Sequence, residues 1–347
     1  MAEKITATGR NITIVIQGQS ITDGKVCPKV IKNITITRKN FPDAELILST
    51  WNKGEVINRE VRLAVAPLDV VVIFNDDPGA VIKREKGISY VSNVNRMIVS
   101  SASGIKLAAN EFVIKIRSDS FFYSNNICNL IDGYFSGDNK LLRSEEFSVF
   151  STRVINCNLY ARNARGYLPY LFHPGDILVA GYKNDILSLF DVPLATSDIF
   201  KLSRTLTHFS TMSLFPEQYI WVNCIRKLQG KLVYKENLYR NEALIVLSEN
   251  YYVNNFITHS VDELGFCWEK QNNKYRSKGK YSVYHHADWL GMYDKYILQK
   301  EVLLSGESLK HQIIKSIMLF YFFFRTNLLR IYLVRKMAIW LFVKRDL

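Results

Sequence analysis

Two cations and an acid occupy alternate positions in the segment EFVIKIRSDS, residues 111–120. On a β-strand, Lys115, Arg117 and Asp119 would project to one side and the two isoleucines to the other. Fixed cations can neutralise a departing phosphate or diphosphate, and a carboxylate can bind a metal that does the same. Burying three charged side chains at the end of an apolar strand is costly, so we interpret them as facing a cleft. The alternative is that Asp119 caps a turn and pairs with Arg117.

Three further residues could move a proton or contact an acceptor. Glu217 lies in the segment SLFPEQYIWVNCIRKL, where a proline predicts the start of a helix. Asp176 follows His173-Pro174-Gly175 in a predicted turn, and His173 could contact acceptor or phosphate. Both carboxylates have a structural alternative, since Glu217 would suit the positive end of a helix and Asp176 an Asx turn. We therefore keep Glu217 and Asp176 as alternative bases for an acceptor hydroxyl.

The elements that must position these residues begin with short apolar runs. NITIVI (11–16), AELILST (44–50) and DVVVIFNDDPG (69–79) predict buried strands, with room between them for crossover helices. Residues 93–109 predict a helix that leads into the fourth strand. This rhythm indicates a parallel α/β sheet, which binds ligands at the carboxyl ends of its strands. After about residue 138 the regularity fades, which predicts a mixed α+β region with residues 271–280 as a mobile loop.

Composition excludes several protein classes. The chain has 347 residues, 48% of them hydrophobic, so it can bury a large core. Five scattered cysteines without a Cys-x-x-Cys pair argue against a disulfide framework or a zinc module. Walker, Gly-x-Ser-x-Gly, Gly-x-Gly-x-x-Gly and His-Glu-x-x-His motifs are missing from the sequence. The N-terminus lacks the apolar run of a secretory signal, which makes the cytoplasm the expected compartment.

The C-terminal segment carries a large share of the net charge of +13. Its longest uncharged run, SIMLFYFFF (316–324), is far shorter than the ~20 residues that cross a bilayer. If residues 315–344 form one helix, all cations except Arg335 fall within roughly 140° of its circumference. This pattern predicts amphipathic helices that lie on an anionic membrane surface, peripheral to the inner face of the plasma membrane. The alternative is a helix docked on the protein's own core. Nucleic acid is a poor partner for so apolar a segment.

The chain resembles the WavE-type lipopolysaccharide-synthesis family in four ordered regions. These are IVIQGQ (14–19), ELILSTW (45–51), FNDDPG (74–79) with NVNRMIVSSASGIK (93–106), and KIRSDS (115–120). The resemblance is clearest over the first 120 residues and continues through HPGD (173–176) and PEQY (216–219). Members of this family are regarded as glycosyltransferases of GT-A-like architecture. The resemblance therefore implies a Rossmann-type sheet that binds a nucleotide-sugar donor.

The resemblance also implies roles for individual residues. The donor would contact strand ends and the start of the next helix, at Gln17, Gly18, Trp51, Asp76, Asp77, Asn95 and Arg96. Its diphosphate would lie near Lys115, Arg117 and Asp119. Asp119 resembles a metal-binding acid of such transferases, which would take Mg²⁺ or Mn²⁺. The motif Ser118-Asp119-Ser120 has a single acid, however, and Lys115 with Arg117 offers a metal-free alternative.

Together these observations predict three regions. Residues 1–135 form the nucleotide-sugar-binding half, residues 136–300 the acceptor half of the same domain, and residues 301–347 the basic membrane-associating segment. The predicted activity is sugar transfer to a lipid-linked or oligosaccharide acceptor of the lipopolysaccharide, O-antigen or capsule type. The alternatives are a non-catalytic, membrane-associated glycan-assembly protein and a nucleotidyl- or phosphotransferase.

Overall fold

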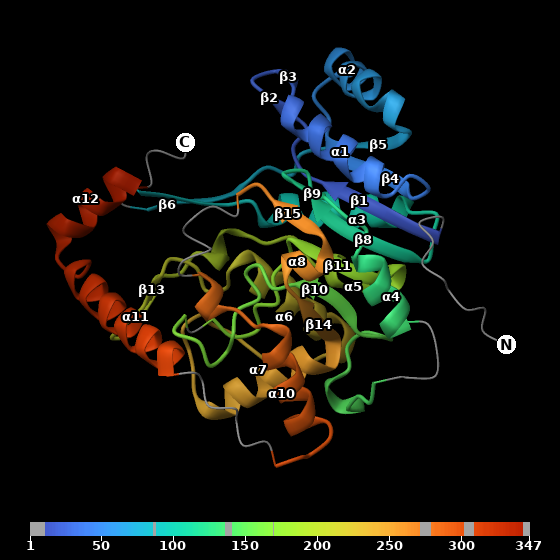
Figure 1. The fold of residues 1–347 in the computed structure, drawn as a ribbon. Helices are drawn as coiled ribbons and strands as arrows, with labels where there is room; N and C mark the ends of the chain where they lie inside the picture. Colours follow the sequence, from blue (N-terminus) through green and yellow to red (C-terminus); the bar gives the residue numbers. More distant parts are fainter. Residues whose placement is uncertain are drawn as a thin grey trace.

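A seven-stranded sheet forms the centre of the protein (Figure 1). The computed structural model describes residues 11–85, 88–135, 141–168, 170–270, 279–301 and 309–342. The strand order is β14-β10-β11-β8-β1-β4-β5. The bounds are β1 (Ile12–Gln17), β4 (Glu45–Trp51), β5 (Val70–Asn75), β8 (Phe112–Arg117), β10 (Val154–Cys157), β11 (Leu178–Tyr182) and β14 (Phe256–His259). Only β11 runs antiparallel to its neighbours, so the predicted α/β class with a mainly parallel sheet is confirmed.

Helices cover both faces of the first strands. The crossover helices are α1 (Pro28–Asn40), α2 (Glu55–Val65) and α3 (Val94–Leu107). In β1, Ile14 and Ile16 pack into the hydrophobic cluster beneath α1 and α2, whereas Val15 packs into the cluster beneath α3. All six residues of β1 are buried. This is why the strand is continuously apolar in the sequence rather than alternating.

Close packing of α3 on the sheet depends on a glycine. A Cβ atom added to Gly104 would lie 2.4 Å from Val15 Cγ1 and 3.0 Å from Ser49 Cβ. We expect Gly104→Ala to lower the free energy of unfolding by about 1–3 kcal/mol, because β1 and β4 cannot move apart without losing their pairing. Gly133→Ala in the exposed part of α4 (Ile127–Phe135), where a Cβ would meet nothing within 4 Å, should leave stability unchanged or slightly higher. Equal urea midpoints for the two variants would contradict this account.

The second half adds helices and three strands to the same sheet. Its helices are α5 (Lys183–Phe190), α6 (Pro216–Gln229), α7 (Glu242–Asn255), α8 (Val261–Leu264) and α10 (His286–Tyr296). The predicted helix over residues 213–228 is confirmed, and α6 begins at its proline. The apolar run FSVFSTRVI (147–155) would allow a strand, but only its last two residues belong to β10. The predicted mobile loop lies almost wholly outside the described residues.

Small two-stranded sheets complete the fold. They pair β2 (Ile21–Thr22) with β3 (Lys25–Val26), β6 (Val81–Glu85) with β7 (Ile88–Ser92), β9 (Ser120–Phe122) with β15 (Phe266–Trp268), and β12 (Ser203–Arg204) with β13 (Phe209–Ser210). The β9–β15 pair matters for the site. It brings residues separated by about half the chain to the end of β8.

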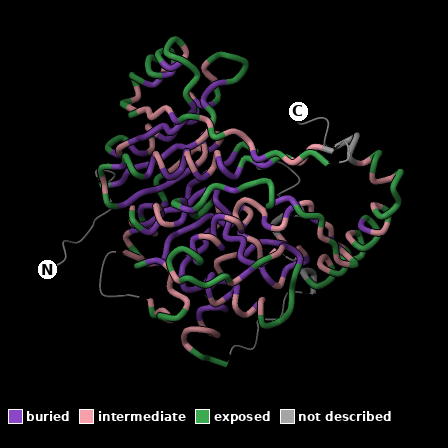
Figure 2. Tube along the Cα trace, turned by 180° about the vertical axis from the view of Figure 1, so that it is seen from behind, coloured by how far each residue is buried: buried purple, intermediate pink, exposed green. Residues whose placement is uncertain are grey.

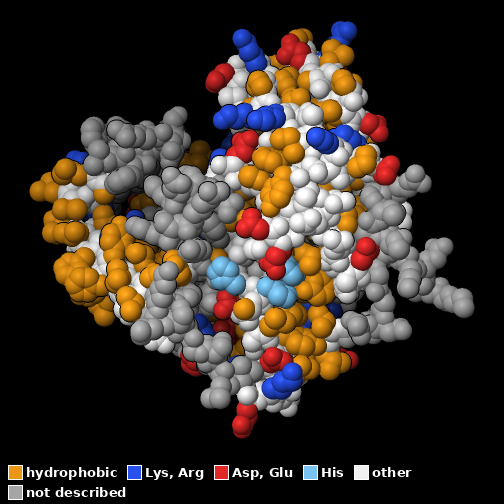
Figure 3. All heavy atoms as spheres, viewed as in Figure 1, with side chains coloured by type: hydrophobic (Ala, Val, Ile, Leu, Met, Phe, Trp, Pro, Cys, Tyr) orange, Lys and Arg blue, Asp and Glu red, His pale blue; other side chains and the backbone are white. Residues whose placement is uncertain are grey.

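The C-terminal segment forms two helices, α11 (Leu309–Leu328) and α12 (Tyr332–Phe342), set against one side of the body (Figures 1 and 2). The expected C-terminal helices are present, and they meet at an angle of 109°. The distribution of cations worked out for a single straight helix over residues 315–344 therefore does not apply to the bent pair. No single described helix has the length and apolar character needed to cross a membrane. The bent pair reaches that length and apolar character only when its two helices are taken together. Figure 3 shows hydrophobic side chains gathered over this region.

Candidate functional site

A pocket of about 600 Å³ opens at the carboxyl ends of β1, β4 and β8. It is the point at which an open α/β sheet binds its ligands. Seven of the residues singled out in the sequence line it: Gln17, Gly18, Trp51, Asp77, Arg96, Arg117 and Asp119. They come from five separate segments of the chain, which the sheet brings to one edge.

The corner where β1 ends is built for close approach of backbone segments. Gly18 has φ +128°, and a Cβ there would lie 2.9 Å from Ser118 Oγ. The Gly18 N–H donates to the Ser49 carbonyl at 3.0 Å, and Gln17 Oε1 accepts from Ser100 Oγ at 2.7 Å. A side chain at position 18 would be strained in this conformation and would press on Ser118. The glycine therefore keeps backbone exposed on the pocket wall.

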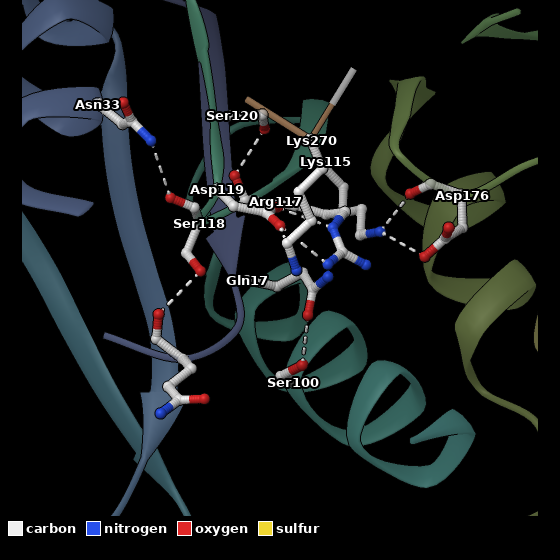
Figure 4. A network of polar contacts seen from close by, with 11 residues as sticks. Gln17, Asn33, Ser100, Lys115, Arg117, Ser118, Asp119, Ser120, Asp176 and Lys270 are labelled. Atoms are coloured by element: carbon white, nitrogen blue, oxygen red, sulfur yellow. Dashed lines mark hydrogen bonds and ion pairs between the residues drawn. The ribbon is translucent and has the colours of Figure 1, made fainter. Parts of the chain in front are cut away.

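A cluster of charges forms the end wall of the pocket (Figure 4). Arg117 donates from Nε to Asp119 Oδ1 at 2.9 Å and from Nη2 to Oδ2 at 3.2 Å. Lys270 Nζ lies 3.2 Å from Asp119 Oδ2. The Arg117 guanidinium and Lys270 hold the pKa of Asp119 below its usual range despite burial. The cluster thus carries two cations for one acid, a net positive charge that suits an anionic ligand.

A second ion pair, between Arg96 and Asp77, also lines the pocket. Arg96 donates from Nε and Nη2 to the two carboxylate oxygens of Asp77, each at 2.8 Å, and from Nη1 to Asn93 Oδ1 at 2.9 Å. The Arg96 guanidinium lowers the pKa of Asp77. Arg96 opens α3 as expected, but its planar head is oriented by Asp77. A phosphate would have to share this guanidinium with the carboxylate.

Lys115 does not line the pocket, although it shares a face of β8 with Arg117. Its side chain is 0% exposed, and Nζ lies 3.4 Å from Asp176 Oδ2 and 4.9 Å from the centre of the Phe190 ring. Nζ also donates to the Asp176 carbonyl oxygen (Figure 4). The strand continues for two residues beyond Lys115, which leaves this cation in the interior. Burial lowers the pKa of Lys115, and the neighbouring Asp176 acts in the opposite direction.

We expect Lys115→Met to lower the free energy of unfolding by about 3–5 kcal/mol, because Asp176 would remain as an uncompensated buried charge. Adding Asp176→Asn to Lys115→Met should recover part of the loss. The measurement is urea denaturation, with the exposed Lys32→Met as the matched control. A Lys115→Met midpoint equal to that of Lys32→Met would contradict the buried pair.

Glu217 and His173 lie together beside Asp176. Glu217 is in the first turn of α6, and its Oε2 lies 3.5 Å from His173 Nε2. His173 and Asp176 flank Gly175, which has φ +76°; a Cβ there would lie 2.7 Å from the Leu159 carbonyl oxygen. Gln218 secures this turn, accepting from the Phe215 N–H at 3.0 Å and donating to the Leu171 carbonyl at 2.7 Å. The loop and the helix thus hold an imidazole and two carboxylates in one cluster.

Burial shifts the pKa values of His173 and Glu217 in opposite directions, and in both cases it favours the neutral form. Burial lowers the pKa of His173 to about 3. Burial, followed by the negative charge of Asp176, raises the pKa of Glu217 to about 7. The effect of burial outweighs the positive end of α6, which alone would favour the charged form. A carboxyl group that titrates near neutral pH has the property needed in a general base.

Arg117 connects the pocket with the acid cluster. Hydrogen bonds and attraction from Asp119, together with the charges of Asp176 and Glu217, raise the pKa of Arg117 above its usual value. Its guanidinium is therefore held by the pocket acid and also attracted by the buried Asp176 and the half-buried Glu217. One permanent cation thus lines the pocket and interacts with a candidate base.

Besides Lys115, two more residues assigned to the donor do not line the pocket. Asp76 is exposed to solvent. Asn95 is buried, and its side-chain amide is bonded to the backbone of Ala195, with the carbonyl oxygen 3.0 Å from Nδ2 and the amide nitrogen 2.7 Å from Oδ1. Asn95 thus fastens α3 to a distant loop.

Other residues of the pocket were missed in the sequence. Lys29, Asn33 and Lys53 line it from α1 and from the loop after β4. Glu269 and Lys270 reach it because β15 pairs with β9, and the Glu269 N–H donates to the Asp119 carbonyl at 3.1 Å. Nothing in the sequence near residue 270 signals this pairing.

The described residues do not offer a set of metal ligands. They contain no group of three His, Cys, Asp or Glu side chains that could hold a metal ion. Asp119, the acid expected to bind Mg²⁺ or Mn²⁺, has both oxygens engaged by cations. The charges of Arg117 and Lys270 oppose the approach of a divalent cation, so we derive no chemical step through a metal.

Comparison with known proteins identifies a family. A family model described as WavE lipopolysaccharide synthesis matches residues 12–322. A search of the curated proteins gave no match. Among solved structures, the chain is similar to an active-site mutant of LgtC, at 10% identity over 50% of this chain and 58% of that chain, with a TM-score of 0.31.

Two further structures show similarity of the same order. One is the mannosyltransferase PcManGT from Pyrobaculum calidifontis in complex with GDP-Man and Mn²⁺, at 10% identity over 70% of this chain and 62% of that chain, with a TM-score of 0.34. The other is S. aureus TarS 1–349, at 11% identity over 90% and 80%, with a TM-score of 0.29. The alignments cover less than two thirds of LgtC and of PcManGT. With TM-scores this low, these structures support no functional argument.

Proposed function

This chain belongs to the WavE lipopolysaccharide synthesis family, and from that premise we propose that it is a glycosyltransferase. It moves a sugar from a nucleotide-sugar donor to an acceptor glycan of the lipopolysaccharide, O-antigen or capsule type. The donor binds in the pocket at the carboxyl ends of β1, β4 and β8. The acceptor approaches from the side of Glu217 and Asp176.

One observation supports the proposal most directly: Arg117 lines the pocket and also interacts with Glu217, whose pKa is raised to about 7 by burial and by the charge of Asp176. Group transfer from a nucleotide sugar requires a positive charge where the diphosphate leaves and a base where the acceptor hydroxyl attacks. In the proposal, Arg117 supplies the positive charge and Glu217 supplies the base.

In the proposed mechanism, the acceptor oxygen forms a bond to the anomeric carbon as the bond from that carbon to the diphosphate oxygen breaks. Glu217 takes the acceptor proton, with Asp176 as the alternative base. The electron pair of the broken bond leaves with the nucleoside diphosphate. Arg117 and Lys270 stabilise the negative charge that develops there. Trp51 and Gln17 line the part of the pocket assigned to the base and ribose.

The test is a panel of nucleoside diphosphates and nucleotide sugars, read by thermal stabilisation with and without EDTA. At least one nucleotide should raise the melting temperature, because a ligand that binds only the folded state stabilises it. Stabilisation that survives EDTA is expected if Arg117 and Lys270 hold the diphosphate. No stabilisation by any nucleotide would contradict the proposal. Labelled donors then show which bond is cut: sugar transfer and nucleotidyl transfer leave the label in different products.

A further inference from the structure

Helices α11 and α12 expose an unusually apolar surface. Among the described residues, 27 large hydrophobic side chains are exposed, and twelve of them lie between Ile313 and Met337. They cover the side of the molecule on which the two helices lie (Figure 3). An apolar patch of this kind on one element usually meets another apolar phase.

The exposed residues of α11 form a stripe that points away from the body. The stripe consists of Ile313, Ile317, Phe320, Phe324 and Leu328, each between 50% and 65% exposed. At 100° per residue they fall within about 80° of the helix circumference, opposite the residues that face the protein. The stripe contains no polar side chain.

The inner face of α11 fixes the helix to the body. Phe322 has its ring 5.9 Å from that of Tyr167 and 4.8 Å from that of His208. Thr326 is 4% exposed, and its hydroxyl donates to the Thr207 carbonyl at 2.8 Å. The outward stripe is therefore held in a defined orientation and is not part of a loose tail.

The charge of the two helices has one sign. Residues 309–342 contain no Asp or Glu, and the cations with described side chains are Lys315, Arg325, Arg330, Arg335 and Lys336. A second copy of the chain would bring these cations against their own kind. A bilayer with anionic headgroups offers both an apolar phase for the stripe and phosphates for the cations.

We propose that α11 and α12 lie in the plane of an anionic lipid bilayer, with the stripe in the acyl boundary and the exposed cations Arg325, Arg330 and Lys336 at the headgroups. In-plane binding is favoured over crossing because a 109° bend separates the helices and cations interrupt both. It is favoured over docking on the protein's own core because the stripe faces away from that core. The proposal goes beyond sugar transfer and does not depend on it.

The position of α11 has a consequence for the acceptor. Tyr167, on which Phe322 rests, lies in the same loop as Tyr170 and His173. Tyr170 packs edge-on against Phe215, with the ring centroids 4.9 Å apart, and Phe215 directly precedes α6 and its Glu217. The bilayer would thus lie on the acceptor side of the site, where a lipid-linked acceptor could be presented.

The test is co-sedimentation of the full chain with vesicles of phosphatidylcholine alone or with added phosphatidylglycerol, without any sugar donor. The parent should bind only the anionic vesicles. Phe320→Ser with Phe324→Ser, and separately Arg325→Glu with Arg330→Glu, should weaken binding at least about tenfold. Failure of vesicle binding can thus be told apart from failure of nucleotide binding.

Matched controls replace the same kinds of exposed side chain, apolar or positively charged, on other helices of the protein. Val56→Ser with Leu63→Ser removes two exposed apolar residues of α2, and Lys32→Glu with Arg59→Glu reverses two exposed cations of α1 and α2. Both should bind like the parent, and all variants should keep the parent's melting temperature. Equal binding to neutral vesicles, resistance to alkaline carbonate extraction, or self-association through these helices without vesicle binding would each overturn the proposal.

Discussion

Replacing Arg117 with glutamine should lower kcat/KM for sugar transfer by about 10²–10³-fold, the usual loss when a positioned donor to a developing negative charge is removed. Arg117 lines the pocket, so glutamine removes the charge that, in the proposal, stabilises the departing diphosphate. Nucleoside diphosphate affinity should fall by about 10–100-fold, since hydrogen bonds to charged groups contribute about 1.5–3 kcal/mol. The measurements are steady-state kinetics and titration calorimetry.

The matched control for Arg117→Gln is Arg62→Gln, which removes a guanidinium from an exposed ion pair with Glu55 on α2. That variant should transfer sugar at the parent rate. Melting curves of both variants separate a local loss of charge from unfolding. An Arg117→Gln enzyme that is folded and retains the parent's kcat/KM would remove the basis for the donor site.

Glu217→Gln should lower kcat by about 10²–10⁴-fold while leaving nucleotide affinity unchanged, because glutamine cannot accept the acceptor proton. The pH dependence gives a second signature. A base works in its deprotonated form, and burial with the charge of Asp176 raises the pKa of Glu217 to about 7. The parent's rate should therefore fall tenfold per pH unit below about pH 7. The residual rate of the variant should lack this acid limb.

Stability distinguishes loss of a base from loss of the fold. A carboxyl group with a raised pKa binds its proton more tightly in the folded state, so it costs the native protein stability as pH rises from about 4.5 to about 7. Glutamine carries no such cost, and Glu217→Gln should be at least as stable as the parent at pH 8. The exposed Glu60→Gln is the control for rate. An acid limb that persists in Glu217→Gln would transfer the role of base to Asp176.

Local patterns predicted the first half of the fold well. The apolar run of β1 is continuous because both faces of that strand are buried, and β-branched runs of this kind read clearly in a sequence. The alternation in β8 correctly placed Ile114 and Ile116 on one side and Lys115 with Arg117 on the other. The alternation could not show how far each side chain lies from the protein surface. Lys115 lies two residues before the end of β8 and is therefore buried.

Other parts of the fold could not be predicted from local patterns, because they depend on pairing between distant segments or on a helix end without a sequence signal. Lys270 reaches the pocket only because β15 pairs with β9, a contact between segments about 150 residues apart. The bend between α11 and α12 falls at Leu329, Arg330 and Ile331, where no glycine or proline marks a helix end. The antiparallel strand β11 joins the two halves by pairing with β10 and β8. Neither pairing is between strands adjacent in a hairpin, so local sequence patterns do not predict them.

One sheet runs through both halves of the protein, and this has a consequence for substrate entry. β8 pairs with β1 on one side and with β11 on the other, through five aligned positions from Leu178 to Tyr182. Rotating one half against the other would break this ladder, so we expect the strands on either side of it to move as one body. Structures with and without nucleotide should superpose over the whole sheet.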